Sequence, residues 1–301
     1  MFRLLSKETN IFSIPIYIGF LSLIVILFNV FNINTLNMIS AVITFAGIAI
    51  GYTLFNKIAL TRRSHLPLFL YTVFIFSLYP GSVDIGIAVA LLSNSILLIM
   101  LTSNHDRLSK DSYLLVGSLL AINYLFLPTT WALTLFVLFH IIGTSDRIGL
   151  NVFRLFFGIG IIFMGYFCLM YYLGYTSFDE RYLPTTTNRL MTEYQSLTSL
   201  FPIAILTLYA IADHFIHFNR KSPSSKFKYT FLLTFLIAQV LSIFLYMGEN
   251  YEYLLLATLP LTIILSRYLR FLKKFWKQEI GLWLITICLL LFKLNSYFNI
   301  F

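Results

Sequence analysis

Charge is scarce in this chain, and negative charge is the scarcest. Only 12 of its 301 residues are Asp or Glu, and charged residues of both signs make up 11%, against about 25% in an ordinary soluble domain. So few charges do not cover the surface of a soluble globule of this length, while hydrophobic residues reach 59%. A soluble domain is therefore excluded, and lipid is the expected solvent for most of the surface.

Cysteine pairs and common enzyme motifs are missing as well. Both cysteines, Cys168 and Cys288, lie inside apolar segments, so no disulfide framework or thiolate metal site is implied. There is no P-loop, dinucleotide fingerprint, serine elbow or zinc-protease motif. No Asp or Glu falls at the centre of an apolar segment, which argues against an ion-coupled pump.

Long apolar segments are what the chain has in abundance. We expect a single all-α transmembrane domain over residues 1–301, because only helices satisfy the backbone of such runs in lipid. Eleven spans are predicted, with a range of about 10 to 12 because several are short. They lie at 11–31, 37–59, 66–80, 83–101, 112–127, 130–144, 152–174, 198–217, 229–247, 251–268 and 279–298. The first has no small-residue cleavage site after it, so we read an uncleaved span rather than a signal peptide.

The basic residues alternate between the gaps. Of 21 Lys and Arg, 18 lie in one alternating set of loops and span ends, counting the segment before the first span; the set includes basic loops at 57–65, 218–228 and 267–278. Because Lys and Arg are retained in the cytoplasm, these loops and the amino terminus are predicted inside, and an odd span count places the carboxyl terminus outside. The net charge of +9 then faces anionic lipid headgroups, and nucleic acid is not an expected partner.

Three pairs of spans are joined on the outer side by tight turns, at 79–82, 127–130 and 247–250. Pro and Gly favour such turns, so each pair is predicted to be a helical hairpin. Short hairpins either leave a cleft in the outer leaflet or sit where the bilayer thins, and the sequence leaves both open. The only long outer loop covers 175–198, within which 188–196 is a candidate interfacial helix.

The outer side also collects acidic residues. Asp84 and Glu252 lie at the mouths of hairpins, where each is either a general base or divalent-cation ligand, or a solvated carboxylate at a helix N-terminus. Trp131 either stacks on a sugar ring or anchors the outer interface. With these three, the candidate outer-cleft residues are Glu249, Arg181 and Arg189.

One histidine pair raises a second possibility. His214 and His217 share a helix face, and with His65 and His140 they would form a four-histidine iron site suited to cleaving a carotenoid-like lipid. The alternative, which we favour, is that the pair marks the headgroup boundary beside Arg220. No metal or other cofactor is therefore expected, a divalent cation being the weak exception.

Three stretches carry a family resemblance: Gly117 through Trp131, Phe153 through Gly174, and Tyr251 through Pro260. They resemble the integral-membrane C-type glycosyltransferases, which take sugars from polyprenyl phosphate donors. The resemblance implies a lipid-linked substrate. That family keeps its catalytic acid in a long first outer loop, whereas here this loop is only 32–36 and has no acid, so no catalytic residue is carried over. The chain also looks like an uncharacterised family of roughly 300-residue inner-membrane proteins of Bacteroidota.

Together these features predict a multi-pass protein of the bacterial inner membrane. Its expected role is to handle a lipid-linked glycan or envelope precursor, or to assist its processing, in an outer-leaflet cleft, without a clear catalytic role of its own. A permease or flippase-like transporter and a histidine–iron oxygenase are the alternatives. Expected partners are the bilayer, with anionic headgroups on the cytoplasmic side, a lipid-linked substrate and a second membrane protein.

Overall fold

The chain is all-helical in the part that its structure, a computed structural model, describes. That part comprises residues 1–10, 12–30, 34–58, 60, 64–102, 112–145, 147–176, 183 and 196–298. It contains no β-strand, and a single isolated bridge joins Glu8 to Ser64. The predicted all-α class is confirmed.

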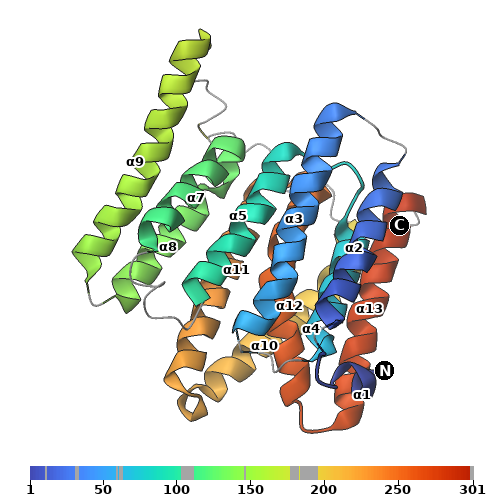
Figure 1. The fold of residues 1–301 in the computed structure, drawn as a ribbon. Coiled ribbons are helices and arrows are strands. Elements are labelled where there is room, and N and C mark those ends of the chain that lie inside the picture. The colour runs from blue at the N-terminus through green and yellow to red at the C-terminus, as the bar shows by residue number, and fades with distance from the viewer. Residues whose placement is uncertain are drawn as a thin grey trace.

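Long helices make up the bundle (Figure 1). In chain order they are α2 (Ser13–Asn29), α3 (Thr35–Ile58), α4 (His65–Leu78), α5 (Ile85–Thr102), α7 (Tyr113–Phe126), α8 (Trp131–Thr144), α9 (Ile148–Leu173), α10 (Phe201–Ile216), α11 (Pro223–Tyr246), α12 (Leu254–Phe271) and α13 (Phe275–Phe298). Short elements flank or connect them: α1 (Phe2–Leu5) and the 3-10 helices η1 (Pro128–Thr130), η4 (Ser196–Leu200), η5 (Phe218–Arg220) and η6 (Tyr251–Tyr253).

Each predicted span overlaps one of these helices, but the predicted basic loops are too long. Residues 223–228 and 275–278 belong to α11 and α13, and 267–271 belong to α12. Hydropathy marks where hydrocarbon ends, whereas a helix continues until its backbone is capped or turned. Pro223 shows this, because it occupies the first turn of α11, where its missing N–H costs nothing.

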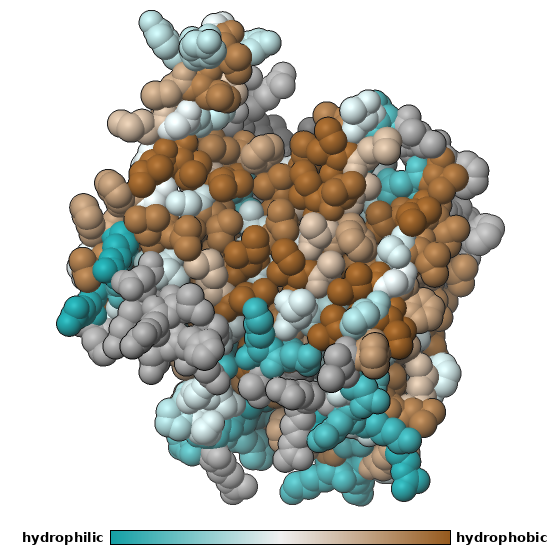
Figure 2. Space-filling view, viewed as in Figure 1, coloured by the Kyte–Doolittle hydropathy of each residue, from teal (hydrophilic) through white to brown (hydrophobic). Residues whose placement is uncertain are grey.

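Within the described residues, seven helical segments are long and apolar enough to cross a membrane, namely α3, α5, α9, α11, α12, α13 and the segment Leu197–Ile216. α2, α4, α7 and the segment Pro128–Thr144 are apolar but shorter. Figure 2 shows a broad brown belt across the bundle, with teal residues gathered below it. On α9 only 11% of the apolar window is buried, and Phe153 and Met164 are among its exposed side chains. Such a surface needs lipid rather than water, so the chain is built as a membrane protein.

The two ends of the bundle differ in what connects the helices (Figure 1). At one end, here called the basic end, lie α1, the α10–α11 connection and the α12–α13 connection, which carries Lys273 and Lys274. At the other, here called the turn end, lie three tight connections, 79–84, 127–130 and 247–253. The upper tips of α3 and α9 rise above the upper ends of α7 and α8. The turn end therefore does not form a flat surface.

Helices α10 and α12 contrast in burial although they pack together. Within the apolar window of α12, 72% of residues are buried, and that helix contacts α4, α5, α10, α11 and α13. Within the apolar window that includes α10, 22% of residues are buried. α12 thus lies at the centre of the bundle, and α10 packs against it at the periphery. Both pockets described below are lined by this pair of helices.

Candidate functional site

Hydrogen bonds join the three connections of the turn end to one another. The hydroxyl of Ser242, near the end of α11, donates to the carbonyl oxygen of Thr129 at 3.0 Å. The hydroxyls of Thr129 and Tyr253 lie 3.3 Å apart. Gly81 and Gly248 adopt positive φ, of 113° and 50°, which glycine tolerates without strain. Segments far apart in the sequence therefore meet here.

Asp84 and Glu252, which were singled out separately, are brought together at this end. The Oε2 of Glu252 accepts a hydrogen bond of 2.9 Å from the backbone N–H of Asp84. The Asp84 side chain is exposed, and its Oδ2 lies 3.1 Å from where a Cβ on Gly86 would be, in the first turn of α5. A carboxylate in that position is stabilised by the helix dipole. The pair thus favours the structural alternative: Glu252 joins two connections, and Asp84 lies directly before the first residue of α5.

Trp131 uses its polar edge inside the protein. Its indole Nε1 donates to the hydroxyl of Tyr246 at 2.9 Å, and the side chain is half-buried. The bond joins the start of α8 to the end of α11. This placement favours the anchoring role over a freely presented stacking face.

Of the remaining candidates for the outer cleft, only Glu249 falls within the described residues, in the same connection as Glu252. Glu249 is exposed in the turn after α11. Arg181 and Arg189 lie outside the described residues, as does most of the predicted outer loop 175–198 and its candidate helix 188–196. The cluster that the structure does show consists of Asp84, Trp131 and Glu252 with their partners.

A buried lysine belongs to the same end. Lys293, 7% exposed on α13, donates from Nζ to the carbonyl oxygen of Tyr79 at 2.6 Å and lies 4.4 Å from the centre of the Phe28 ring. The Tyr79 hydroxyl accepts from Asn29. The sequence showed Lys293 as an unusual charge in an apolar segment but gave no sign of its partner.

An apolar pocket of about 570 Å³ opens beside the turn end. α4, η4, α10, α11 and α12 line it with Phe74, Leu78, Leu197, Thr198, Leu200, Phe201, Ile203, Ala204, Val240, Ile243, Leu254, Ala257, Thr258 and Leu261. Two threonines are the only polar members of this set, so the pocket suits hydrocarbon. None of the predicted outer-cleft residues lines it, although Glu252 lies two residues before Leu254. Hydropathy cannot reveal such a pocket, because its lining looks like any other lipid-facing sequence.

The four histidines are not gathered. His140 packs its ring 4.6 Å from Phe231, and His65 lies beside Tyr17. His214 stacks on Tyr229. Among the described residues, no three His, Cys, Asp or Glu side chains form a group that would hold a metal ion. The predicted four-histidine arrangement does not form, so the oxygenase alternative loses its ligand set.

His214 and His217 also have separate partners. The Nδ1 of His217 lies 3.1 Å from the Oδ1 of Asp213, whereas the Nδ1 of His214 lies 2.9 Å from the Nζ of Lys221. Both histidines lie at the basic end of the bundle. The sequence missed Lys221, Tyr229 and Arg267 as neighbours of His214, because they come from other connections and helices.

Comparison with known proteins gives a family without a function. A model of the family of unknown function DUF6427 matches residues 1–300. No curated protein and no solved structure matches the chain. Because the match covers nearly the whole sequence, the chain belongs to the DUF6427 family.

Proposed function

We propose that the chain is an eleven-span protein of the bacterial inner membrane with its basic end in the cytoplasm. The alternation of Lys and Arg between the gaps supports this orientation, as does the gathering of basic side chains at one end of the bundle. The four shorter apolar helices support the count, since together with the seven longer segments they make eleven. The turn end and the apolar pocket then face the outer leaflet.

The proposed role is to hold a lipid-linked glycan or other envelope precursor in that leaflet. The observation that carries the proposal is the apolar pocket between α4, α10, α11 and α12. Its volume of about 570 Å³ falls within the usual range of ligand sites. A segment of a polyprenyl or acyl chain would fill it from the side of α10, the peripheral helix.

The role is one of holding or assisting rather than of catalysis. Glu252 and Trp131 direct their polar atoms at Asp84 N–H and at the Tyr246 hydroxyl. Groups committed to such bonds stabilise the turn end and are not poised to activate a sugar acceptor. A partner membrane protein would then supply the chemistry.

A tryptophan placed in the pocket tests the proposal. Ala204 lines the pocket from α10 and is exposed, so Ala204→Trp fills the space without disturbing the core. Ala212 is an exposed alanine of the same helix that lines neither pocket, so Ala212→Trp is the matched control. The probe is an uncharged polyprenol with a photoreactive group on its terminal unit, offered to the full chain in nanodiscs.

Crosslinks of the wild-type protein are expected on α10 and α12 beside the pocket. Ala204→Trp should remove most of them, and Ala212→Trp should leave them unchanged. Crosslinks scattered over the bundle, or equally reduced by both variants, would refute the proposed site.

The orientation has its own test. Glu249→Cys, in a turn-end connection, should react with a membrane-impermeant maleimide added to intact spheroplasts. Lys273→Cys, in the α12–α13 connection, should react only after permeabilisation. Both native cysteines lie in apolar helices, Cys168 in α9 and Cys288 in α13. The reverse pattern of labelling would invert the proposed topology.

A further inference from the structure

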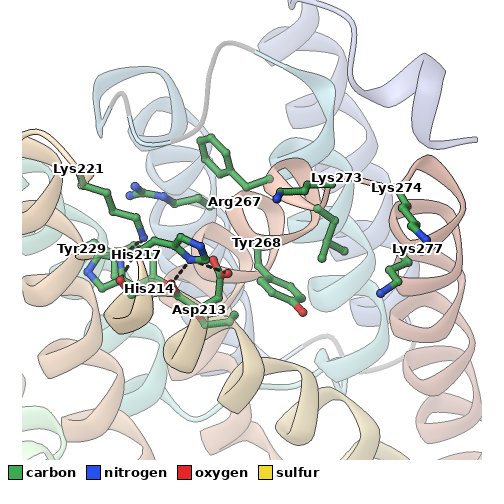
Figure 3. A pocket seen from close by; sticks show the side chains of 13 residues that line it. Asp213, His214, His217, Lys221, Tyr229, Arg267, Tyr268, Lys273, Lys274 and Lys277 are labelled. Carbon is green, nitrogen blue, oxygen red and sulfur yellow. Dashed lines mark hydrogen bonds and ion pairs between the residues drawn. The ribbon is translucent and has the colours of Figure 1, made fainter. Parts of the chain in front are cut away.

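A second pocket, of about 590 Å³, opens at the basic end between α10 and the α12–α13 connection. Figure 3 shows its side chains. They are Ala210, Asp213 and His214 of α10; His217, directly after that helix; Lys221; Tyr229 of α11; Arg267, Tyr268 and Phe271 of α12; and Leu272, Lys273, Lys274 and Lys277. In the view of Figure 3, Lys221 and Arg267 lie to one side of Tyr268, and Lys273, Lys274 and Lys277 to the other. We refer to this site as the basic pocket.

The charges in the basic pocket do not cancel. Five Lys and Arg line it against one carboxylate, that of Asp213. That carboxylate is already engaged, because His217 Nδ1 lies 3.1 Å from its Oδ1. The pKa of the Lys221 ammonium is lowered by burial and by the positive charge of Arg267. Neighbouring cations thus repel each other across the pocket, and an anion bound between them would relieve that repulsion.

Two donors in the pocket wall lack an acceptor. His214 is 1% exposed, and its Nδ1 accepts from the Lys221 ammonium at 2.9 Å. A neutral imidazole that accepts at Nδ1 carries its hydrogen on Nε2, and this Nε2 has no hydrogen-bond partner among the described residues.

Arg267 presents the second donor. It is 7% exposed, and its Nη2 donates to the Ser225 hydroxyl at 2.8 Å, while its Nη1 has no partner in the described part of the chain. An orphaned buried donor costs about 1–3 kcal/mol. Native proteins retain such groups where a ligand or another unseen partner completes them.

Aromatic packing fixes these donors in place. The ring of His214 stacks on Tyr229 at 3.8 Å between centres, with 16° between the planes. The guanidinium of Arg267 lies 4.9 Å from the centre of the same ring. Tyr229 therefore holds an imidazole and a guanidinium together, and the donors need little reorganisation to receive a ligand.

From these contacts we infer that the basic pocket binds a phosphate group. Phosphate offers several acceptor oxygens and matches the fork of an arginine flanked by lysines. The pocket also has an apolar wall of Ala210, Phe271 and Leu272, and Phe215 and Ile216 of α10 are exposed next to it. The headgroup of an anionic lipid combines both features, and a soluble phosphate ester shares only the first. This site is separate from the apolar pocket, and the inference does not depend on what that pocket holds.

Three probes separate the possible sources of the phosphate. The full chain is purified in a neutral detergent, and binding of inorganic phosphate, phosphatidylglycerol and diacylglycerol is measured by titration calorimetry and native mass spectrometry. Diacylglycerol has the acyl chains but no phosphate. Binding of phosphatidylglycerol alone assigns the site to a lipid headgroup, and binding of inorganic phosphate assigns it to phosphate as such. Failure of both to bind, or equal binding of diacylglycerol, would overturn the inference.

Charge-matched variants show whether the pocket is responsible. Lys221→Gln with Lys274→Gln removes two cations of the pocket, and affinity is expected to fall by at least about tenfold. Arg3→Gln with Lys57→Gln removes two exposed cations of the same end outside the pocket and should change affinity by less than about twofold. Equal losses in the two double variants would show attraction to the whole basic end rather than a site. If the first double variant does not fold, Lys273→Gln with Lys277→Gln, both exposed, asks the same question.

Discussion

The two ends of the bundle differ in how their charged side chains are matched, although the Tyr251 hydroxyl at the turn end also has no hydrogen-bond partner among the described residues. At the turn end, the Glu252 carboxylate, the Trp131 indole and the Lys293 ammonium each have a hydrogen-bonding partner within the chain. At the basic end, Arg267 and His214 each keep a donor that none of the described residues accepts. Paired groups hold a fold together, whereas unpaired donors beside excess charge await a ligand. The residues first predicted for the outer cleft stabilise the fold at the turn end. The basic end has the properties of a binding site.

The largest effect expected from this difference is stabilisation by a ligand at the basic end. Phosphatidylglycerol at about 100 times its dissociation constant should raise the free energy of unfolding by about 2.7 kcal/mol, because it binds only the folded state. Thermal unfolding in detergent, with and without the lipid, measures this shift. Lys221→Gln with Lys274→Gln should abolish most of it. If phosphatidylglycerol raised the free energy of unfolding of that variant as much as that of the wild type, the proposed difference between the two ends would be wrong.

Removing a hydrogen bond that stabilises the turn end should change the free energy of unfolding by slightly less. Glu252→Ala deletes the acceptor for Asp84 N–H and is expected to lower stability by about 2 kcal/mol. Glu252→Gln keeps an acceptor and should recover much of the loss. Glu249→Ala, in the same connection but exposed, should stay within about 0.5 kcal/mol. Urea titration followed by tyrosine fluorescence compares the three. If Glu249→Ala costs as much as Glu252→Ala, the bond to Asp84 is not what stabilises this end.

A smaller loss is expected at Trp131. Trp131→Phe keeps an aromatic face but removes the donor to Tyr246, so stability should fall by about 1 kcal/mol. Tyr246→Phe removes the acceptor, and the double variant should lose less than the sum of the two single variants. Additive losses would show that the two side chains act independently, and would reopen the reading of Trp131 as a stacking surface.

The smallest expected effect is a pH dependence at the basic end. The pKa of Lys221 lies below its usual value of 10.5, so this ammonium loses its charge at lower pH than an exposed lysine does. His214, Asp213 and Arg267 are the groups that face it. Affinity for inorganic phosphate should therefore fall by a few-fold between about pH 8 and pH 10. Calorimetry on Lys221→Gln, which lacks the group, should show a shallower fall, and parallel curves would count against a contact between Lys221 and the anion.

The helices could largely be predicted from the sequence, because a lipid solvent constrains which residues a span contains. Lipid demands long apolar runs, and each predicted span overlaps one of the observed helices. The first turns of α11 and α13 were missed, because polar residues such as 223–228 extend a helix beyond its hydrophobic segment. The meeting of Asp84 with Glu252 was foreseeable only in part: both lie at turns predicted on the same side, but which turns touch depends on packing.

The basic pocket could not be predicted, for a physical reason. Lys221, Arg267 and Lys274 come from three separate elements, and periodicity along one helix says nothing of which helix is its neighbour. His214 was noticed for its spacing to His217, yet its contacts are with Lys221 and Tyr229. The orphaned donors at His214 and Arg267 become visible only when every buried polar atom is matched to a partner.

A density map of the full chain in nanodiscs that contain phosphatidylglycerol tests the central claim most directly. The account predicts headgroup density in the basic pocket, within hydrogen-bonding distance of Lys221 and Arg267, and none in contact with the Glu252 carboxylate. An empty basic pocket, with a headgroup instead bound at Asp84 and Glu252, would contradict it.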